Sequence, residues 1–335
     1  MEMNASFQSL LATEMARYIS LKQALGRRFQ YPSITLLKLD QFLCKLGKPS
    51  PDLTAETFAQ WIQTMESVSS NTRLTRMHVI RNFCLYRRRM APACFVPDPT
   101  QFPRSRPTVK PYLFSDHDVA RLLSHSASIT GSLRSPLRRA ATRLAIVLLY
   151  TTGLRRGELL RLIVKDYNPS TQTLLVQSSK FHKSRLLPLP IDVASEIEQF
   201  LKVHKAIRPS LPAATPLLWN PYCGGRGYTG TQLRENLSVL LMLAGIKKPD
   251  GRLPRIHDFR FSFAVNALIR WYRNGADVQA KLPFLAAYMG HVSVLSTYYY
   301  LRFIEPLATL ASSSFAARYG GLVRYIERRR DCHES

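Results

Sequence analysis

Acidic residues are scarce in this sequence. Its 335 residues include 22 Asp and Glu against 47 Lys and Arg, which gives a formal net charge of +25. So basic a chain favours a polyanionic partner, nucleic acid before a membrane surface, although charge alone does not separate an enzyme from a simple binder. The sequence also lacks a G-x-x-x-x-G-K-[ST] loop and the carboxylate cluster that a two-metal nuclease needs. It therefore predicts no metal and no cofactor.

Cysteines and long apolar runs are sparse as well. The five cysteines form no C-x-x-C pair and have no histidines at zinc-site spacing, so we expect reduced thiols in a cytosolic protein. The longest apolar run, LAIVLLY (144–150), is far shorter than the roughly 20 residues that span a bilayer. The N-terminal stretch MEMNASFQSLLATEM lacks the order of a signal peptide. These absences predict an intracellular protein with no membrane partner.

Residues 1–92 show the apolar spacing of helices. The segments ITLLKLDQFLCKLG (34–47) and TAETFAQWIQTM (54–65) each place apolar residues on one helical face, and Thr54 suits the N-cap of the second. A third segment, SSNTRLTRMHVIRNFCLYRRRM (69–90), has six arginines and no acid between the first and the last of them. They are either the solvated side of a helix or a surface that faces phosphates, and their density favours the second. The candidate DNA contacts here are Arg73, Arg76, Arg81, Arg87 and Arg88.

Proline is concentrated between residues 93 and 111. Six prolines lie between Pro92 and Pro111, and Arg104 and Arg106 add positive charge. Proline at this density disfavours a helix and is typical of an extended linker. We therefore expect a basic linker over 93–111 that separates a helical domain at 1–92 from a second domain at 112–304. Arg104 and Arg106 are further candidates for contact with DNA.

The second domain is predicted to be mostly helical with a small sheet. The stretches TQTLLVQSS (171–179) and SRLLPLP (184–190) are expected to be the two strands of a hairpin. A buried helix should start near Pro136 and break at Gly153, and Ser115 with Asp118 should cap an earlier one. The remaining predicted helices cover 191–205, 231–244, 257–273, 283–288 and 294–303. The tail, 305–335, is expected to form one or two short helices.

Four short segments of this domain carry side chains suited to chemistry. They are TTGLRRGELLRL with Arg155 and Glu158, KFHKSR with Lys180 and Lys183, HDFRFSFA with His257 and Arg260, and MGHVSVLSTYYYL with His291 and Tyr300. Taken singly, each has an ordinary explanation, such as a surface ion pair, a solvated turn or aromatic packing. Their combination and their order in the chain are what need explaining.

Together, the four segments resemble the tyrosine recombinases, also called the integrase family. TGLRRGELL is similar to the family pattern T-G-x-R-x-x-E, HDFRFSFA to H-D-x-R-x-x-F-A, and MGHVSVLSTYYYL to L-G-H-x-x-x-x-T-x-x-Y. The resemblance covers roughly residues 29–300. It implies a helical core-binding domain that contacts DNA, followed by an α+β catalytic domain. The segment KFHKSRLLPLP (180–190) resembles the corresponding segment in family members that transposons and other mobile elements carry.

The resemblance also implies roles for five residues. Tyr300 would attack the scissile phosphate and form a 3′-phosphotyrosyl link, although a free tyrosine, with a pKa of about 10, needs help to do so. Arg155 and Arg260 would bind the non-bridging oxygens, because guanidinium groups stay charged and bind phosphate in a bidentate manner. His257 would exchange a proton with the tyrosine, and His291 would donate a hydrogen bond to the phosphate.

Supporting roles follow from the same resemblance. Glu158 would orient the first arginine, and Lys180 would protonate the leaving 5′ oxygen from the tip of the hairpin. Lys183 competes for that role, because a shift in hairpin register would exchange the two lysines. Lys183 and Arg185 are otherwise expected to contact backbone phosphates.

The choice of tyrosine rests on spacing. Tyr298, Tyr299 and Tyr300 are consecutive, and helical neighbours point about 100° apart, so only one can face the arginines. The family spacing from His291 selects Tyr300, with Tyr298 as the second candidate.

The function implied is site-specific DNA recombination for integration or transposition of a mobile element. We expect a bacterial, cytoplasmic and DNA-associated enzyme that acts on double-stranded DNA. It should assemble as a homotetramer on two DNA sites, with its tail docked on a neighbouring subunit. Accessory recombinases are candidate further partners. Two alternatives remain open from the sequence. One is a type IB topoisomerase-like enzyme that relaxes supercoils, and the other is a non-catalytic DNA-binding protein with this fold.

Overall fold

The computed structural model describes residues 7–27, 29–47, 51–104, 110–131, 135–177, 184–210, 212–220, 226–291 and 293–301. Arg106, Lys180, Lys183 and the predicted tail helices therefore lie outside the described residues. The chain divides into two compact units, Met1–Val109 and Lys110–Ser335. Within the described ranges, no helix has the length and apolar character needed to cross a bilayer.

Unit 1 is helical. Its elements are α1 (Ala12–Ala24), α2 (Gln30–Leu46), α3 (Ala55–Gln63), α4 (Ser70–Arg87) and the short 3-10 helix η1 (Pro99–Gln101). The Thr54 hydroxyl accepts a hydrogen bond from the Thr57 backbone N–H, which confirms Thr54 as the N-cap of α3. Tyr18, Leu39, Trp61, Ile80 and Phe83 are among the side chains buried in its core.

The first part of the Pro-rich segment also packs on unit 1. Phe102 is buried in the core of unit 1, and Phe95 and Val96 pack against that core. Asp98 caps η1 by accepting a hydrogen bond from the Thr100 backbone N–H. Aromatic burial therefore fixes residues 95–102 on the helices, whereas proline content alone had suggested an extended linker.

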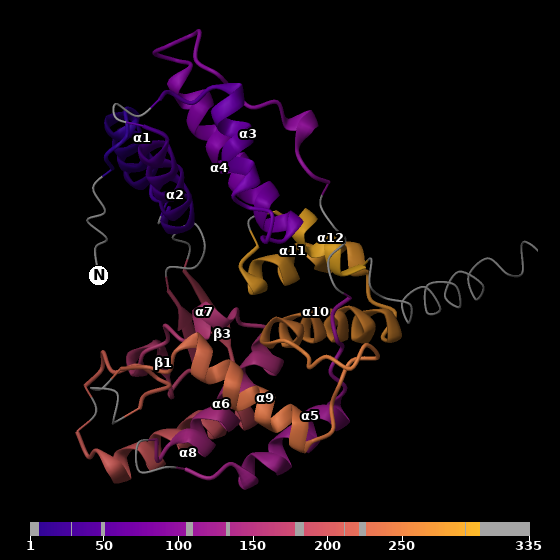
Figure 1. Ribbon diagram of the computed structural model, residues 1–335. Helices are drawn as coiled ribbons and strands as arrows, with labels where there is room; N and C mark the ends of the chain where they lie inside the picture. Colours follow the sequence, from indigo (N-terminus) through magenta and orange to yellow (C-terminus); the bar gives the residue numbers. More distant parts are fainter. Residues whose placement is uncertain are drawn as a thin grey trace, which may run out of the picture. The chain divides into compact units, whose positions relative to one another are not determined.

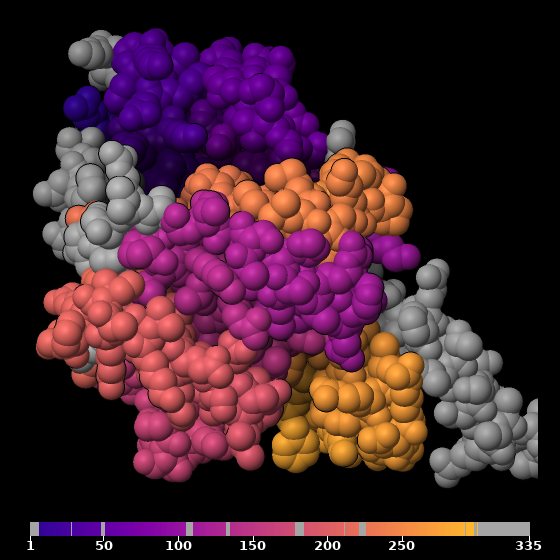
Figure 2. Space-filling view, turned by 90° about the horizontal axis from the view of Figure 1, so that it is seen from below, coloured from indigo at the N-terminus to yellow at the C-terminus, as the bar shows by residue number. Residues whose placement is uncertain are grey.

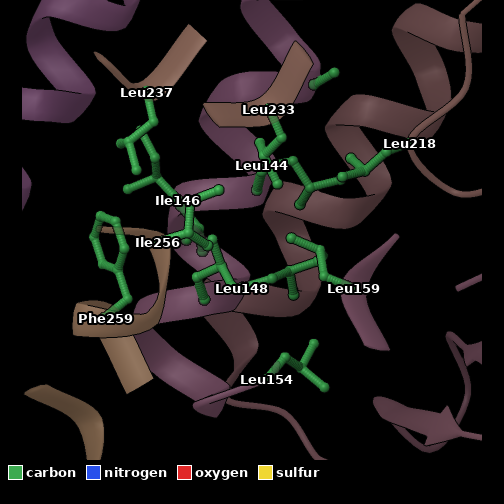
Figure 3. Close-up of a cluster of buried hydrophobic side chains, with 14 of the residues drawn as sticks. Leu144, Ile146, Leu148, Leu154, Leu159, Leu218, Leu233, Leu237, Ile256 and Phe259 are labelled. Atoms are coloured by element: carbon green, nitrogen blue, oxygen red, sulfur yellow. The ribbon is translucent and has the colours of Figure 1, made fainter. Parts of the chain in front are cut away.

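Unit 2 is built around a buried helix, α6 (Arg138–Thr152), which packs against α8 (Ile191–Ile207) and α10 (Ile256–Arg273) (Figure 1). Leu144, Ile146 and Leu148 of α6 meet Leu233 and Leu237 of α9 (Gly230–Leu243) in the cluster of apolar side chains in Figure 3. Such a helix, apolar on nearly all sides, is stable only in the interior of a domain. The other helices of the unit are α5 (Asp116–His125), α7 (Arg156–Leu159), α11 (Val278–Met289) and α12 (Leu295–Leu301), with 3-10 turns η2 (Ser126–Ser128) and η3 (Val164–Asp166).

Unit 2 also contains a small antiparallel sheet. Strand β2 (Thr173–Val176) lies between β1 (Tyr167–Asn168) and β3 (Arg185–Pro188), and Val176 pairs with Arg185. The two predicted strands are present, and β1 adds a third that is too short for a sequence pattern to indicate. The mainly α fold with a small sheet is thus confirmed. In Figure 2, the magenta, salmon and orange segments of unit 2, far apart in the chain, share one surface.

Helix α11 is longer than the sequence suggested. The sequence predicts this helix over 283–288. Instead, Asp277 caps it by accepting a hydrogen bond from the Ala280 backbone N–H, and Pro283 lies inside the helix. Helix α11 ends at Gly290, whose φ of +66° is in the left-handed region that favours glycine.

Candidate active site

The first arginine of the site is placed by a sharp turn after α6. Gly153 ends α6 with φ +61°, and a Cβ at this position would lie 2.5 Å from the Phe263 ring, so only glycine fits. Two residues later the chain starts α7, where the Arg155 backbone N–H donates to the Glu158 carboxylate at 3.0 Å. The Arg155 side chain keeps 28% of its surface exposed and so remains accessible from solvent.

Glu158 is a buried carboxylate shared by two guanidinium groups. Arg155 Nη1 donates to Oε1 at 2.6 Å, and Arg185, at the start of β3, donates to Oε2 at 2.9 Å and to Oε1 at 3.3 Å. Burial by itself would raise the pKa of Glu158, but the hydrogen bonds from Arg185 and Arg155 outweigh it and lower the pKa to about 2. Glu158 is therefore ionised near neutral pH.

Three arginines converge on the last carbonyl groups of α11. These carbonyls have no partner within the helix and lie at the negative end of its dipole, which suits cations. The pairs are Arg185 Nε to Tyr288 O at 2.7 Å, Arg260 Nη2 to Met289 O at 2.7 Å and Arg155 Nη2 to Gly290 O at 3.1 Å. The end of one helix thus fixes three guanidinium groups that come from three separate elements.

Arg260 is the most enclosed of the three. It projects from α10, is 1% exposed, and donates to Gly153 O at 2.6 Å as well as to α11. Burial lowers the pKa of Arg260 to about 10, while the charge of Tyr300 and a hydrogen bond with it act in the opposite direction. The guanidinium is therefore still cationic near neutral pH, and the tyrosine lies within its reach.

His291 is a neutral acceptor at neutral pH. Its Nε2 lies 2.8 Å from Arg260 Nη2 and its Nδ1 lies 2.8 Å from Thr297 Oγ1. Since a guanidinium can only donate, Nε2 must accept and Nδ1–H must donate to the threonine. Burial, together with the charges of Arg260 and Arg155, lowers the pKa of His291 to about 4.

Tyr300 is buried among these groups. Its side chain is 4% exposed, its ring stacks on His291 with centroids 5.8 Å apart, and the Phe261 ring meets it edge-on at 4.9 Å. Helix α12 therefore directs Tyr300, at the spacing predicted from His291, toward the arginines. The side chains of Tyr298 and Tyr299 lie outside the described part of the chain.

His257 lies at the solvent side of the same helix as Arg260. It is exposed and packs edge-on against Phe261, with ring centroids 5.4 Å apart. Even there, desolvation by the surrounding protein lowers the pKa of His257, and the positive charges of Arg260 and Arg255 lower it further. The imidazole is thus biased toward its neutral form.

A cleft of about 650 Å³ opens beside Arg155 and His257. Its lining is strongly basic and includes three arginines that the sequence patterns did not single out, Arg156, Arg234 and Arg255. Arg156 follows Arg155 directly in the first motif, so its position could have been noticed, whereas Arg234 on α9 has no local signal. Among the residues that the structure describes, no three His, Cys, Asp or Glu side chains form a group able to hold a metal ion.

Two arginines predicted to contact DNA are bound to protein groups instead. Arg87 is 5% exposed and pairs with Glu14 and Asp52 inside unit 1. Arg185, predicted for backbone phosphates, is occupied by Glu158 and the end of α11. In both cases the acidic or carbonyl partners are distant in the sequence, so the local density of basic residues gave no sign of them.

The other predicted DNA contacts among the described residues belong to unit 1. Arg73, Arg76 and Arg81 lie on α4, and Arg88 directly follows that helix. Arg104 follows η1. Their role in DNA contact stays a prediction.

Comparisons with known proteins place the chain among integrases and recombinases. The model of the Phage integrase family matches residues 114–304. The protein named "Putative integrase/recombinase y4rB" of Sinorhizobium fredii (strain NBRC 101917 / NGR234) is 30% identical over 286 residues, which cover 85% of this chain and 90% of that protein. Tyrosine recombinase XerA of Pyrococcus furiosus is 28% identical over 167 residues, covering 50% of this chain and 52% of XerA.

Two solved structures show the same fold. The XerH site-specific recombinase bound to its palindromic difH substrate has a TM-score of 0.60 at 19% identity, over 84% of this chain and 78% of XerH. An integrase of transposon Tn1549, in complex with a circular intermediate DNA, also has a TM-score of 0.60, at 16% identity, over 88% of this chain and 95% of that structure.

Proposed function

This chain belongs to the phage integrase family of tyrosine recombinases, and from that membership we propose that it breaks and rejoins DNA strands at specific sites through Tyr300. The observation that carries the proposal is the enclosure of Tyr300 by His291 and Arg260, with Arg155 held by the same helix end. Such a cluster offers a nucleophile and fixed positive charge at one point, which is what attack on a phosphodiester requires.

In the proposed reaction, the phenol oxygen of Tyr300 forms a bond to the scissile phosphorus as the bond from phosphorus to the 5′ oxygen breaks. The phenol proton passes to His257, whose lowered pKa keeps it neutral and able to accept. Lys180 gives a proton to the departing 5′ oxygen, so a 5′ hydroxyl and a 3′-phosphotyrosyl link result. Attack by a 5′ hydroxyl of another strand reverses these steps and releases the tyrosine.

Arg155 and Arg260 are proposed to hold the non-bridging oxygens. Charge at these oxygens grows during attack, and the loss of one donor aimed at such charge typically slows a reaction by about 100- to 1,000-fold. Because both guanidinium groups are already fixed by main-chain carbonyls, little reorganisation accompanies substrate binding. Neutral His291 would donate to phosphate only after a change of tautomer, so we assign it first to the support of Arg260.

DNA is the proposed substrate and partner of both units. The basic cleft beside Arg155 and the arginines of α4 are suited to phosphate contacts, and the solved neighbours include DNA complexes. We further propose that unit 1 is the core-binding domain, that four copies act on two DNA sites with the tail 305–335 docked on a neighbour, and that accessory recombinases take part. Integration or transposition of a mobile element is the favoured context, and a topoisomerase-like activity is not favoured.

The decisive experiment traps the covalent intermediate. Nicked suicide duplexes tiled from DNA flanking the gene are incubated with wild type, Tyr300→Phe and the matched control Tyr298→Phe, then boiled in SDS. We expect a protein–DNA band with wild type and Tyr298→Phe and none with Tyr300→Phe, while binding before denaturation is equal for all three.

Other outcomes have clear meanings. A band that persists in Tyr300→Phe but not in Tyr298→Phe would move the nucleophile to Tyr298. Tight binding by wild type with no band on any tile would contradict the proposed chemistry. The sequence of the positive tile can then be placed once in a supercoiled plasmid. Relaxation of this plasmid without strand exchange between two sites would indicate the topoisomerase-like alternative.

A further inference from the structure

Arg185 is enclosed by protein groups although the sequence places it beside a hairpin tip. Its side chain is 11% exposed, and all three kinds of guanidinium nitrogen are engaged. Nε donates to Tyr288 O at 2.7 Å, Nη2 to Glu158 Oε2 at 2.9 Å and Nη1 to Glu158 Oε1 at 3.3 Å. In this arrangement it is directed at the carboxylate and not at a phosphate.

The contact matters because of the charge that Glu158 carries. If Arg155 were the only partner of this buried carboxylate, the pair would be close to neutral, and the attraction of Arg155 for a phosphate would be largely cancelled. With Arg185 on the same carboxylate, two guanidinium groups share one negative charge. The group of Arg155, Arg185 and Glu158 then has a net charge of +1, which is available next to Arg155.

We propose that Arg185 is a positioning residue whose charge neutralises Glu158, so that Arg155 retains its own positive charge for the scissile phosphate. This inference rests on the proposed function. Three guanidinium groups and one carboxylate leave the core of the site with two positive charges, since His291 is neutral at neutral pH. Attack on a singly charged phosphodiester adds a second negative charge, so the count matches the transition state better than the ground state.

A purely structural role for Arg185 would predict different behaviour. Such a role would require only that the hydrogen bonds to Glu158 and Tyr288 be kept, whatever the charge of the carboxylate. The charge-balance role instead predicts that losing both opposite charges at once is less harmful than losing Arg185 alone. The double-mutant comparison measures this coupling, and a substrate that carries less charge then tests whether the coupling acts on the reaction.

The experiment measures the single-turnover rate of covalent adduct formation on a suicide duplex. Arg185→Met removes the charge and keeps the length of the side chain, and we expect it to slow the reaction about 10- to 100-fold, less than loss of a donor that touches phosphate. Arg185→Lys keeps the charge and should fall between Arg185→Met and wild type. The double variant with Glu158→Gln and Arg185→Met should be at least about fivefold faster than Arg185→Met alone.

A second substrate tests the electrostatic cause. A duplex with a methylphosphonate at the scissile position has a methyl group in place of one charged oxygen, so it needs less positive charge. On this substrate the ratio of the wild-type rate to the Arg185→Met rate should shrink to below about threefold. Thermal unfolding of each variant shows that the compared proteins are folded.

The results that overturn the inference are distinct from those that overturn the proposed function. A double variant as slow as Arg185→Met, or a rate ratio unchanged on the methylphosphonate, would overturn the inference while wild-type adduct formation upholds the function. If folded wild type forms no adduct on any duplex, the proposed function fails and the inference fails with it.

Discussion

The His291 and Tyr300 rings lie nearly parallel, with 14° between their planes and 5.8 Å between their centroids. Arg260 holds the imidazole through Nε2 and also lies within hydrogen-bonding reach of Tyr300. The hydroxyl of Thr297, one turn before the tyrosine, accepts from the opposite edge of the same imidazole. The position of Tyr300 is therefore tied to the helix that follows Gly290, and changes at that turn should reach the chemistry.

Gly290→Ala should disturb both stability and reaction. Gly290 has φ +66°, and an added Cβ would lie 2.7 Å from Arg185 Nη1. We expect about 1 kcal/mol of backbone strain together with displacement of Arg185, hence a slower rate of adduct formation. Urea unfolding and the suicide-duplex rate measure the two effects.

Gly275→Ala is the matched control for that substitution. Gly275 has a similar φ of +65°, but nothing lies within 4 Å of the position that its Cβ would occupy. It should lose about 1 kcal/mol of stability and keep its rate. Equal rates for the two variants would refute the proposed link between the Gly290 turn and the arginines.

Acid should weaken the folded state through His291. Its pKa is lowered from 6.5 to about 4 on folding, so the unfolded chain takes up a proton at a higher pH than the folded chain does. The stability that neutral His291 contributes is complete above about pH 6.5, falls as the pH drops, and is lost below about pH 4. A shift of this size corresponds to about 3 kcal/mol.

The measurement is urea unfolding at pH 7.5 and pH 4.5, for wild type, His291→Gln and the exposed control His117→Gln. His291→Gln should reduce the difference between the free energies of unfolding at the two pH values. His117→Gln should leave that difference unchanged. His257 and His204, whose pKa values are also lowered, add to the wild-type difference with the same sign. If the pH dependence of stability in His291→Gln equals that of wild type, the loss of stability in acid does not come from protonation of His291.

A change of leaving group in the substrate can distinguish the roles of Lys180 and Lys183. Lys180→Ala should slow adduct formation by at least about 100-fold, because the departing 5′ oxygen then leaves without a proton donor. A duplex with sulfur in place of that bridging oxygen should restore most of the rate, since a thiolate leaves without protonation. Lys183→Ala should show neither effect, and the reverse pattern would assign the proton donor to Lys183.

Arg87→Met should destabilise unit 1. Arg87 is 5% exposed and binds Glu14 and Asp52, whereas the next residue, Arg88, is exposed. The expected loss is about 2 kcal/mol, below the 3–5 kcal/mol typical of a broken buried pair, because both carboxylates regain water. Arg88→Met serves as the control and should change stability by less than about 0.5 kcal/mol in urea unfolding. A similar cost for both variants would contradict the assignment.

Local signals in the sequence were sufficient for the helix caps at Thr54 and Ser115 and for the order of the motifs. The cap at Thr54 and the capping box of Ser115 with Asp118 are formed by residues three positions apart, so the pattern contains the whole interaction. The break at Gly153 was predictable for the same reason. The mainly helical fold followed from such local patterns.

Partners far apart in the chain could not be predicted in this way. Arg87 and Arg185 look like solvent-exposed cations in the sequence, because Glu14, Asp52 and Glu158 approach them only after folding. The start of α11 differs from these cases, because its cap is local: Asp277 accepts from the Ala280 backbone N–H, and the predicted start at Pro283 overlooks that signal. The four family motifs could be identified, but how their charges are balanced depends on tertiary contacts.

The three arginines at the end of α11 are held by main-chain oxygens of residues 288 to 290. A carbonyl group is present whichever amino acid occupies the position, so mutation cannot delete it. Substitution of the side chains at 288 and 289 therefore leaves the groups that orient the cations in place, even where, as for buried Met289, it would disturb the core. The orientation of the three cations depends instead on the length of α11 and on Gly290, which ends it.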